Sequence, residues 1–125
     1  ECDWSSGRVL FRSRDDVGTL IFDEVDTGVS GRAAQKIGLK LREVSSSRQV
    51  VCVTHLAQIA ALADTQYRIR KEVRGGKTFT QVGELDEDGR EQELARMIGG
   101  AKITSLTLRN AAEMLKLARS EPKKP

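Results

Sequence analysis

The sequence has few of the residues that build disulfide frameworks and zinc sites, and it has no long apolar run. Its 125 residues include two cysteines and one histidine. Cys2 and Cys52 are too few for a disulfide framework, and no Cys-x-x-Cys pair is present to hold zinc. No apolar run approaches the roughly 18 residues that span a bilayer, and the first residues do not resemble a signal peptide. We therefore expect a cytoplasmic protein with no membrane partner.

A charge excess of one sign is also missing from most of the chain. The 21 Lys and Arg against 18 Asp and Glu give +3, and 38% hydrophobic residues suit one small globular domain. From residue 116 onward four bases face one acid, and in residues 1–14 three bases face two acids. Residues 15–115 carry 14 bases and 15 acids, so the basic pI gives this segment no support for DNA binding.

Hydrophobic periodicity predicts an α/β chain. The apolar run 19–22 is typical of a buried strand, and Val50–Thr54, apolar on both faces, predicts a parallel neighbour. A helical stripe between them begins at Ser30-Gly31, and Ser45–Ser47 ends it. The rest is predicted as a short helix at 57–63, strands at 67–73 and 78–82 joined across Gly75-Gly76, a solvated acidic loop at 84–89, a helix ending at Gly99-Gly100, and a helix from about 104 to Pro122. Residues 1–14 fit neither helix nor strand.

Two adjacent carboxylates end the first apolar strand. Leu20-Ile21-Phe22 leads directly into Asp23 and Glu24. Ligands of open α/β sheets bind at the carboxyl ends of the strands, and neighbouring strand residues point to opposite faces. We therefore expect a division of roles, in which Asp23 binds Mg²⁺ and Glu24 acts as base toward an attacking water.

The single histidine follows the second apolar strand. If the strands 19–23 and 50–54 lie side by side, His55 emerges near the two carboxylates. A neutral imidazole there could hydrogen-bond a γ-phosphate or the attacking water without transferring a proton. Cys52, within the Val-rich strand, reads as a small buried apolar residue.

Three segments occur in an order that resembles the C-terminal part of a known family. They are TLIFDEVDTGVSGRAAQKIG, QVVCVTHLAQIAALAD and ELARMIGGAKITSLTLRNAAEML. Together they resemble the RecN family of bacterial DNA repair proteins, in the SMC-like branch of the ABC ATPases. The resemblance implies a partial P-loop NTPase lobe of the ABC/SMC head type at 15–119, between a poorly defined lead-in at 1–14 and a disordered tail at 120–125. The lobe would have parallel strands, an antiparallel edge hairpin and C-terminal helices.

The resemblance implies roles for individual residues. Leu20–Glu24 matches the Walker B strand, with Asp23 near Mg²⁺ and Glu24 as the catalytic carboxylate. His55 matches the switch histidine. The segment 25–30 matches the D-loop, which crosses the interface between two heads beside the nucleotide. Its residues toward that nucleotide would be Asp26, Gly28 and Ser30, although many ABC proteins carry an aspartate where Ser30 stands.

The sequence contains neither the Walker A pattern G-x-x-x-x-G-K-[ST] nor an LSGGE-like signature segment. Gly76-Lys77-Thr78 imitates the end of a Walker A motif, but its surroundings predict a hairpin. The resemblance therefore implies ATP and Mg²⁺ as cofactors only in a complete protein, which acts in DNA double-strand break repair and recombination. Its partners would be the N-terminal Walker A half, a second head in a homodimer, and DNA. It would be nucleoid-associated, and we expect this chain alone to be inactive.

Two other functions fit the residues. A metal-dependent phosphohydrolase could use Asp23, Glu24, Asp26 and His55 as ligands. A non-catalytic module could instead serve dimerisation or DNA bridging.

A basic stripe on the strand 67–74 allows two interpretations. Arg68, Arg70 and Arg74 share one face and could contact DNA phosphates. Charges on an edge strand also block aggregation, and the interruption of the stripe by Glu72 favours that interpretation.

Overall fold

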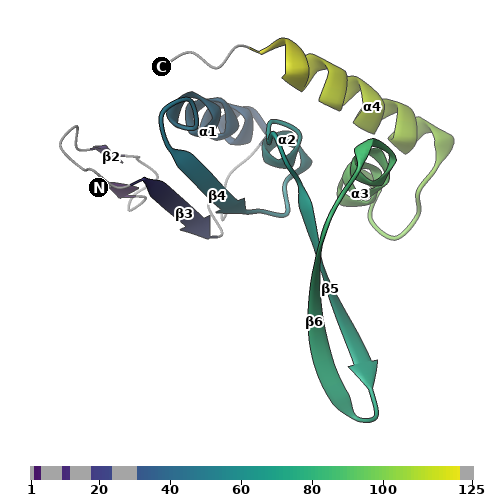
Figure 1. Ribbon diagram of the computed structural model, residues 1–125. Helices are drawn as coiled ribbons and strands as arrows, with labels where there is room; N and C mark the ends of the chain where they lie inside the picture. Colours follow the sequence, from purple (N-terminus) through teal and green to yellow (C-terminus); the bar gives the residue numbers. More distant parts are fainter. Residues whose placement is uncertain (1, 4–9, 12–17, 24–30, 122–125) are drawn as a thin grey trace.

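The computed structural model describes residues 2–3, 10–11, 18–23 and 31–121. Figure 1 shows a parallel strand pair beside a group of helices, with a long hairpin projecting away from both. In chain order the elements are β1 (Cys2–Asp3), β2 (Leu10–Phe11), β3 (Thr19–Asp23), α1 (Gly31–Val44), β4 (Gln49–Val53), α2 (Ala57–Ala60), β5 (Tyr67–Arg74), β6 (Lys77–Glu84), α3 (Glu87–Gly99) and α4 (Ser105–Ser120). The α/β class is confirmed.

The strands β3 and β4 pair in parallel, as predicted, with Thr19 opposite Gln49 and Asp23 opposite Val53. The helix α1 connects them, and the Ser45–Ser47 turn ends it. The prediction of strands buried on both faces was wrong. Only one face of the pair packs on helices, and Ile21 on the other face is 73% exposed.

The strands β5 and β6 form the predicted antiparallel hairpin, two residues longer at β6 than expected toward Glu84. Gly75 and Gly76 make its turn with φ values of 55° and 76°, in the left-handed region that suits glycine. The Gly76-Lys77-Thr78 segment therefore lies in a hairpin turn and the start of β6, where no helix follows to form a phosphate-binding loop.

Three further predictions need correction. Cys2–Asp3 and Leu10–Phe11 pair as short antiparallel strands within the lead-in that was expected to hold no strand. The prediction of an acidic loop at 84–89 was wrong from residue 87 onward, where α3 begins. The side chain of Asp86 caps this helix by accepting the Gly89 N–H at 2.8 Å, and the first turn carries Glu87 and Asp88. Acids at that position are stabilised by the helix dipole. Ser120, placed in the tail, belongs to α4.

One apolar cluster joins the parallel strands to the helices. It comprises Phe22, Ala34, Leu41 and Ile59, from β3, α1 and α2. Helix α1 approaches α2 closely, because a Cβ added at Gly38 would lie 2.6 Å from Leu62 Cδ1. The small residue therefore sets the distance between α1 and the α2 segment.

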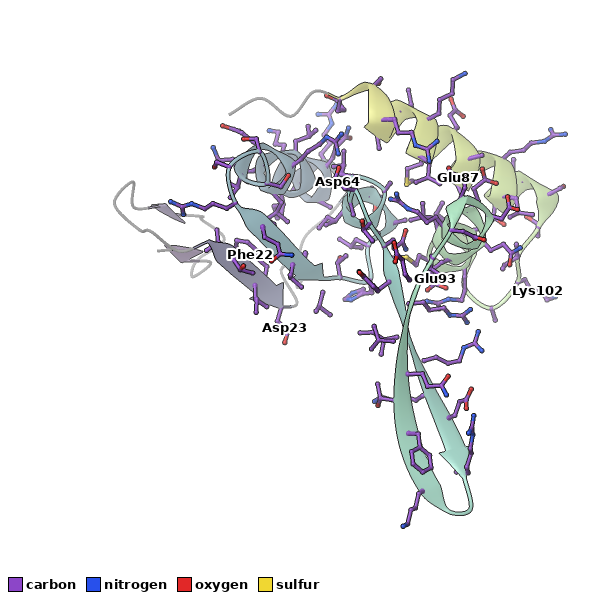
Figure 2. All side chains as sticks on the ribbon, viewed as in Figure 1. Phe22, Asp23, Asp64, Glu87, Glu93 and Lys102 are labelled. Atoms are coloured by element: carbon purple, nitrogen blue, oxygen red, sulfur yellow. The ribbon has the colours of Figure 1, made fainter. Side chains whose placement is uncertain are left out.

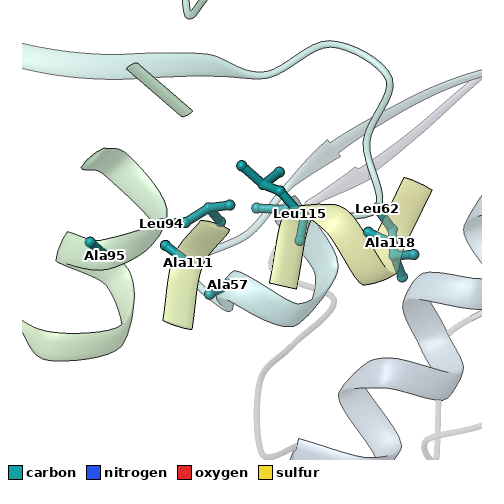
Figure 3. Close-up of a cluster of buried hydrophobic side chains, with 9 residues drawn as sticks. Ala57, Leu62, Leu94, Ala95, Ala111, Leu115 and Ala118 are labelled. Atoms are coloured by element: carbon teal, nitrogen blue, oxygen red, sulfur yellow. The ribbon is translucent and has the colours of Figure 1, made fainter. Parts of the chain in front are cut away.

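A second apolar cluster holds α2, α3 and α4 together. Figure 3 shows Leu94 of α3 and Leu115 of α4 packed among small side chains. Its buried members are Ala57, Ala60, Ala61, Leu62, Leu94, Ala95, Ala111, Leu115 and Ala118. Because α2 contributes to both clusters, it connects the strand layer to the C-terminal helices.

Two arginines bind the backbone carbonyls at the end of α2. Arg90 Nη2 donates to the carbonyls of Ala60, Ala61 and Ala63 at 3.3, 3.4 and 2.9 Å. Arg42 Nη1 donates to the Leu62 carbonyl at 2.7 Å. Burial lowers the pKa of Arg90 from its ordinary value. These bonds satisfy carbonyls at the end of a short helix, and at Ala60 they add to the bond that its carbonyl accepts from the Ala63 N–H at 3.2 Å.

In the part of the chain that the structure describes, no helix is long and apolar enough to cross a membrane.

The packing of α4 predicts a large difference between two of its leucines. Leu115 is 2% exposed and Leu117 is 60% exposed. Leu115→Ala should lower the free energy of unfolding by about 3 kcal/mol through lost burial and a cavity, whereas Leu117→Ala should change it by less than about 1 kcal/mol. Urea denaturation followed by circular dichroism measures both, and equal losses would contradict this account of the core.

The carbonyl contacts predict a similar contrast for arginine. Arg90→Met keeps an apolar stem but removes the donors, so unfolding free energy should fall by about 3 kcal/mol. The control Arg109→Met, on the exposed surface of α4, should stay within about 0.5 kcal/mol. The same denaturation experiment decides, and a loss for Arg90→Met no greater than the control would exclude the capping role.

Candidate functional site

The carboxyl ends of β3 and β4 lie at one edge of the sheet. Asp23 ends β3, and its register partner Val53 ends β4. Because the pair is parallel, both strands end at this edge, and His55 follows β4 there. The sequence analysis predicted that His55 lies near the carboxylates if the two strands are neighbours, and the two strands are neighbours.

Asp23 lies on the open face of the strand pair. Its neighbour Phe22 is 2% exposed and packs among α1 and α2, whereas Asp23 is exposed. Figure 2 shows Asp23 at the tip of β3, on the side away from the helices. The alternation expected for a strand thus places the predicted metal ligand on the face that no described element covers.

His55 lies in the short connection between β4 and α2. It is exposed, two residues beyond the end of β4. The hydroxyl of Thr54 accepts the Leu56 N–H at 3.0 Å, and Leu56 precedes the first residue of α2. This hydroxyl turn holds the connection in one conformation. The position of His55 is therefore set by the strand on one side and by α2 on the other.

The start of α1 also lies near this edge. A Cβ added at Gly31, its first residue, would be 3.9 Å from Gln58 Nε2 of α2. The carboxyl ends of two strands, the His55 connection and the first residue of α1 are therefore neighbouring features. The structure brings Asp23 and His55 to one edge, and the other predicted site residues, Glu24, Asp26, Gly28 and Ser30, lie outside the described residues.

The described residues were also compared with the ligand sets that hold metal ions. Among the residues that the structure describes, no three His, Cys, Asp or Glu side chains are grouped to hold a metal ion. Asp23 and His55 are the two described members of the four-residue set proposed for a phosphohydrolase. An exposed carboxylate at a strand end is nevertheless a suitable oxygen ligand for Mg²⁺.

A polar cleft of about 290 Å³ lies at the other end of α1, and sequence patterns did not indicate it. It is lined by Arg42, Ala61, Ala63, Asp64, Leu85, Asp86, Glu87, Arg90, Ala118 and Arg119. Arg42 and Arg90 bind carbonyls, and Arg119 pairs with Glu87, which lowers the pKa of that carboxyl. The cleft is therefore lined by charges that already bind one another or the backbone.

Comparison with known proteins identifies close sequence relatives. No family model matches the chain. The DNA repair protein RecN of Bacillus subtilis (strain 168) is 51% identical over 109 residues, which is 87% of this chain and 19% of that protein. RecN of Halalkalibacterium halodurans is 47% identical over 90% of this chain, and RecN of Vibrio cholerae serotype O1 is 46% identical over 86%. Each match covers 20% of the relative.

A solved structure shares the fold. It is a chain described in work on the structural biochemistry of ATP-driven dimerization and DNA stimulated activation of SMC ATPases. It superimposes with a TM-score of 0.55 at 18% identity, over 70% of this chain and 52% of its own. The chain spans about a fifth of the length of the relatives that it matches, and its fold is that of part of an SMC ATPase head. At 46% to 51% identity over 86% to 90% of its length, the chain belongs to the RecN family.

Proposed function

We propose that this chain supplies the Mg²⁺ ligand, the catalytic carboxylate and the switch histidine of an ATP-hydrolysing head. The longer protein would act in DNA repair, as the name of its relatives suggests, and within DNA repair we propose double-strand break repair and recombination. The observation that carries the proposal is the position of Asp23 and His55, which lie exposed at one edge of a parallel strand pair with an SMC-type fold.

Asp23 suits the metal role because of its exposure and its place at the strand end. A carboxylate oxygen is the type of ligand that Mg²⁺ prefers, and strand-end acids hold this ion in P-loop NTPases. When bound, Mg²⁺ neutralises charge that develops on the phosphates. The task of Asp23 would be to hold the ion at the carboxyl edge of β3.

Glu24 and His55 would act on the attacking water and the γ-phosphate. Glu24 follows Asp23 directly, so it has the position of a general base that orients water and accepts its proton. His55 would donate a hydrogen bond from its ring N–H to a phosphate oxygen, which senses the phosphate without proton transfer. The hydroxyl turn at Thr54 supports this role by holding the connection.

The open face of the strand pair supports the proposal that another part of the longer protein covers it. Ile21, Val51 and Val53 lie on that face with 73%, 44% and 42% of their surface exposed, beside Asp23. Parallel sheets are normally covered on both faces. An N-terminal half carrying Walker A would cover the apolar residues and bring its phosphate-binding loop to the face on which Asp23 lies. The nucleotide site would then form between the two halves.

The segment 25–30 would contact a second head. As a D-loop, its residues Asp26, Gly28 and Ser30 would lie beside the nucleotide of the partner head in a homodimer. Binding of ATP between two heads would favour the closed dimer, and hydrolysis would release it. DNA would be a partner of the complete protein, which would be cytoplasmic and associated with the nucleoid.

An ATPase assay on separated halves tests the proposal. The chain alone should show no turnover, because it lacks Walker A. Co-expression with the N-terminal half of the longer protein should give Mg²⁺-dependent ATP hydrolysis, and Glu24→Gln should lower its kcat by about 100-fold or more.

Glu113→Gln provides the matched control, since Glu113 is an exposed acid on α4 and carries the same charge change. It should leave kcat within about twofold of the wild type. ATP turnover by the chain alone that Glu24→Gln abolishes would refute the division of the site between two halves. Metal-dependent phosphate-ester hydrolysis by the chain alone would favour a phosphohydrolase instead.

A further inference from the structure

The positive charge of the central chain is concentrated in the β5–β6 hairpin. Residues 67–84 contain five Lys and Arg against two Glu, whereas the remainder of 15–115 contains nine bases and 13 acids. Figure 1 shows that the hairpin projects away from the helices and the parallel strands. With eight residues in each strand it is about 26 Å long. The segment that extends farthest from the body is therefore also the most basic.

The register of the hairpin separates its side chains into two faces. Arg68, Arg70, Glu72 and Arg74 alternate along β5 with Tyr67, Ile69, Lys71 and Val73. Lys77 lies opposite Arg74, and Phe79 lies opposite Glu72, so both share the face of these arginines. We call this set the basic face: Arg68, Arg70, Glu72, Arg74, Lys77 and Phe79. The other face carries the apolar residues Tyr67, Ile69, Val73 and Val82 and a single base, Lys71.

The ion pairs of the basic face change the interpretation of Glu72, which in the sequence interrupts the basic stripe. Its carboxylate binds Arg74 at 2.6 Å, so it engages one arginine locally and does not divide the whole face. Arg68 binds Glu93 of α3 at 3.4 Å and anchors the base of the hairpin. Among the described residues, Arg70 and Lys77 make no ion pair, and both are exposed. Arg70 in the middle of β5 and Lys77 beside the turn are therefore available to a partner.

Protection against aggregation does not explain this composition. Charges on an edge strand block strand pairing, but that protection does not require an exposed aromatic ring among them. The basic face also exposes Phe79, with 48% of its surface accessible, between the positive charges. An aromatic ring among basic side chains is typical of surfaces that bind nucleic acids. There the phosphates contact the lysine and arginine side chains, and the nucleobases stack on the ring. A two-stranded ribbon is also narrow enough to enter a DNA major groove.

The geometry points to the basic face of the β5–β6 hairpin as a contact surface for DNA phosphates, with Arg70 and Lys77 as its principal cations. This inference rests on the proposed function in one respect, that the complete protein acts on DNA. It adds the surface, the residues and the chemistry of the contact. Duplex and single-stranded DNA offer the same phosphate chemistry, and the experiment distinguishes them.

Fluorescence anisotropy with labelled DNA tests the contact. The 125-residue chain is titrated into a 30-bp duplex and, separately, a 30-nucleotide single strand, each between 50 and 200 mM NaCl. Arg70→Gln/Lys77→Gln should weaken binding by about tenfold at 50 mM, and the slope of log K against log salt should fall in magnitude by about 1.8 for duplex or about 1.4 for the single strand. The substrate that shows the larger loss is the one that the hairpin prefers.

Arg109→Gln/Lys116→Gln is the matched control, because it removes one arginine and one lysine from the exposed surface of α4. It should change affinity less than threefold, and circular dichroism should show that both variants are folded. Equal losses in the two double variants would overturn the inference. So would tighter binding to phosphatidylserine vesicles than to either DNA, or no DNA binding by the wild-type chain. None of these outcomes would affect the ATPase test of the proposed function.

A gain of affinity tests the same surface from the opposite direction. Glu72→Gln removes the only acid of the basic face and releases Arg74 from its 2.6 Å ion pair. DNA affinity should rise severalfold and the salt slope should steepen by about 0.9 for duplex. Glu113→Gln, with the same charge change on α4, should have a smaller effect. Equal effects of Glu72→Gln and Glu113→Gln would show that net charge alone sets the affinity, and would overturn the inference.

Discussion

The rest of the structure depends on how the carbonyl groups at the end of α2 are satisfied. This helix has four residues, too few to be stable alone, and the carbonyls of Ala60 to Ala63 each accept an arginine N–H. Arg42 comes from α1 and Arg90 from α3, and Arg42 Nε also donates to the Glu121 carbonyl beyond α4. One short segment thus holds all the longer helices together. Because α2 contributes to both apolar clusters, the arginines and the cores stabilise the same arrangement.

This arrangement leaves one face of the parallel strands open, and Asp23 lies on that face. Phe22 and the helices fill one side of β3 and β4, and the opposite side presents Ile21, Val51 and Asp23 together. The apolar side chains on this face are exposed to water, and their exposure is unfavourable. A second layer on this face would remove that cost and would enclose Asp23, so fold completion and assembly of the site would be one event. The open face is thus a physical reason to regard the site as one half of a pair.

The sequence was informative where a feature depends on local pattern. Alternation and helical periodicity predicted β3, α1, β4 and the hairpin, and the predicted strand ends already placed Asp23 and His55 at one edge. Burial on both faces of the strands was overestimated, because apolar composition reflects every layer that a strand meets, including layers outside this chain. The cap at Asp86 was missed because a capping acid and a solvated acid look alike in sequence. The contacts of Arg90 were invisible for a different reason: their partners lie 27 to 30 residues away.

The same contacts join the two surfaces of functional interest. Gln66 directly precedes β5, and its backbone carbonyl accepts the N–H of Leu85, the residue that follows β6. Its side-chain oxygen accepts a hydrogen bond from Arg90 Nε at 3.2 Å. Arg90 in turn holds the end of α2, and α2 follows directly from the His55 connection. The base of the hairpin and His55 therefore lie at the two ends of one hydrogen-bonded segment, residues 55–66, whose central part around α2 is buried. A displacement of either end is resisted by the same few bonds, so the hairpin and the histidine are held in a defined relation to each other while the tip of the hairpin stays exposed to solvent.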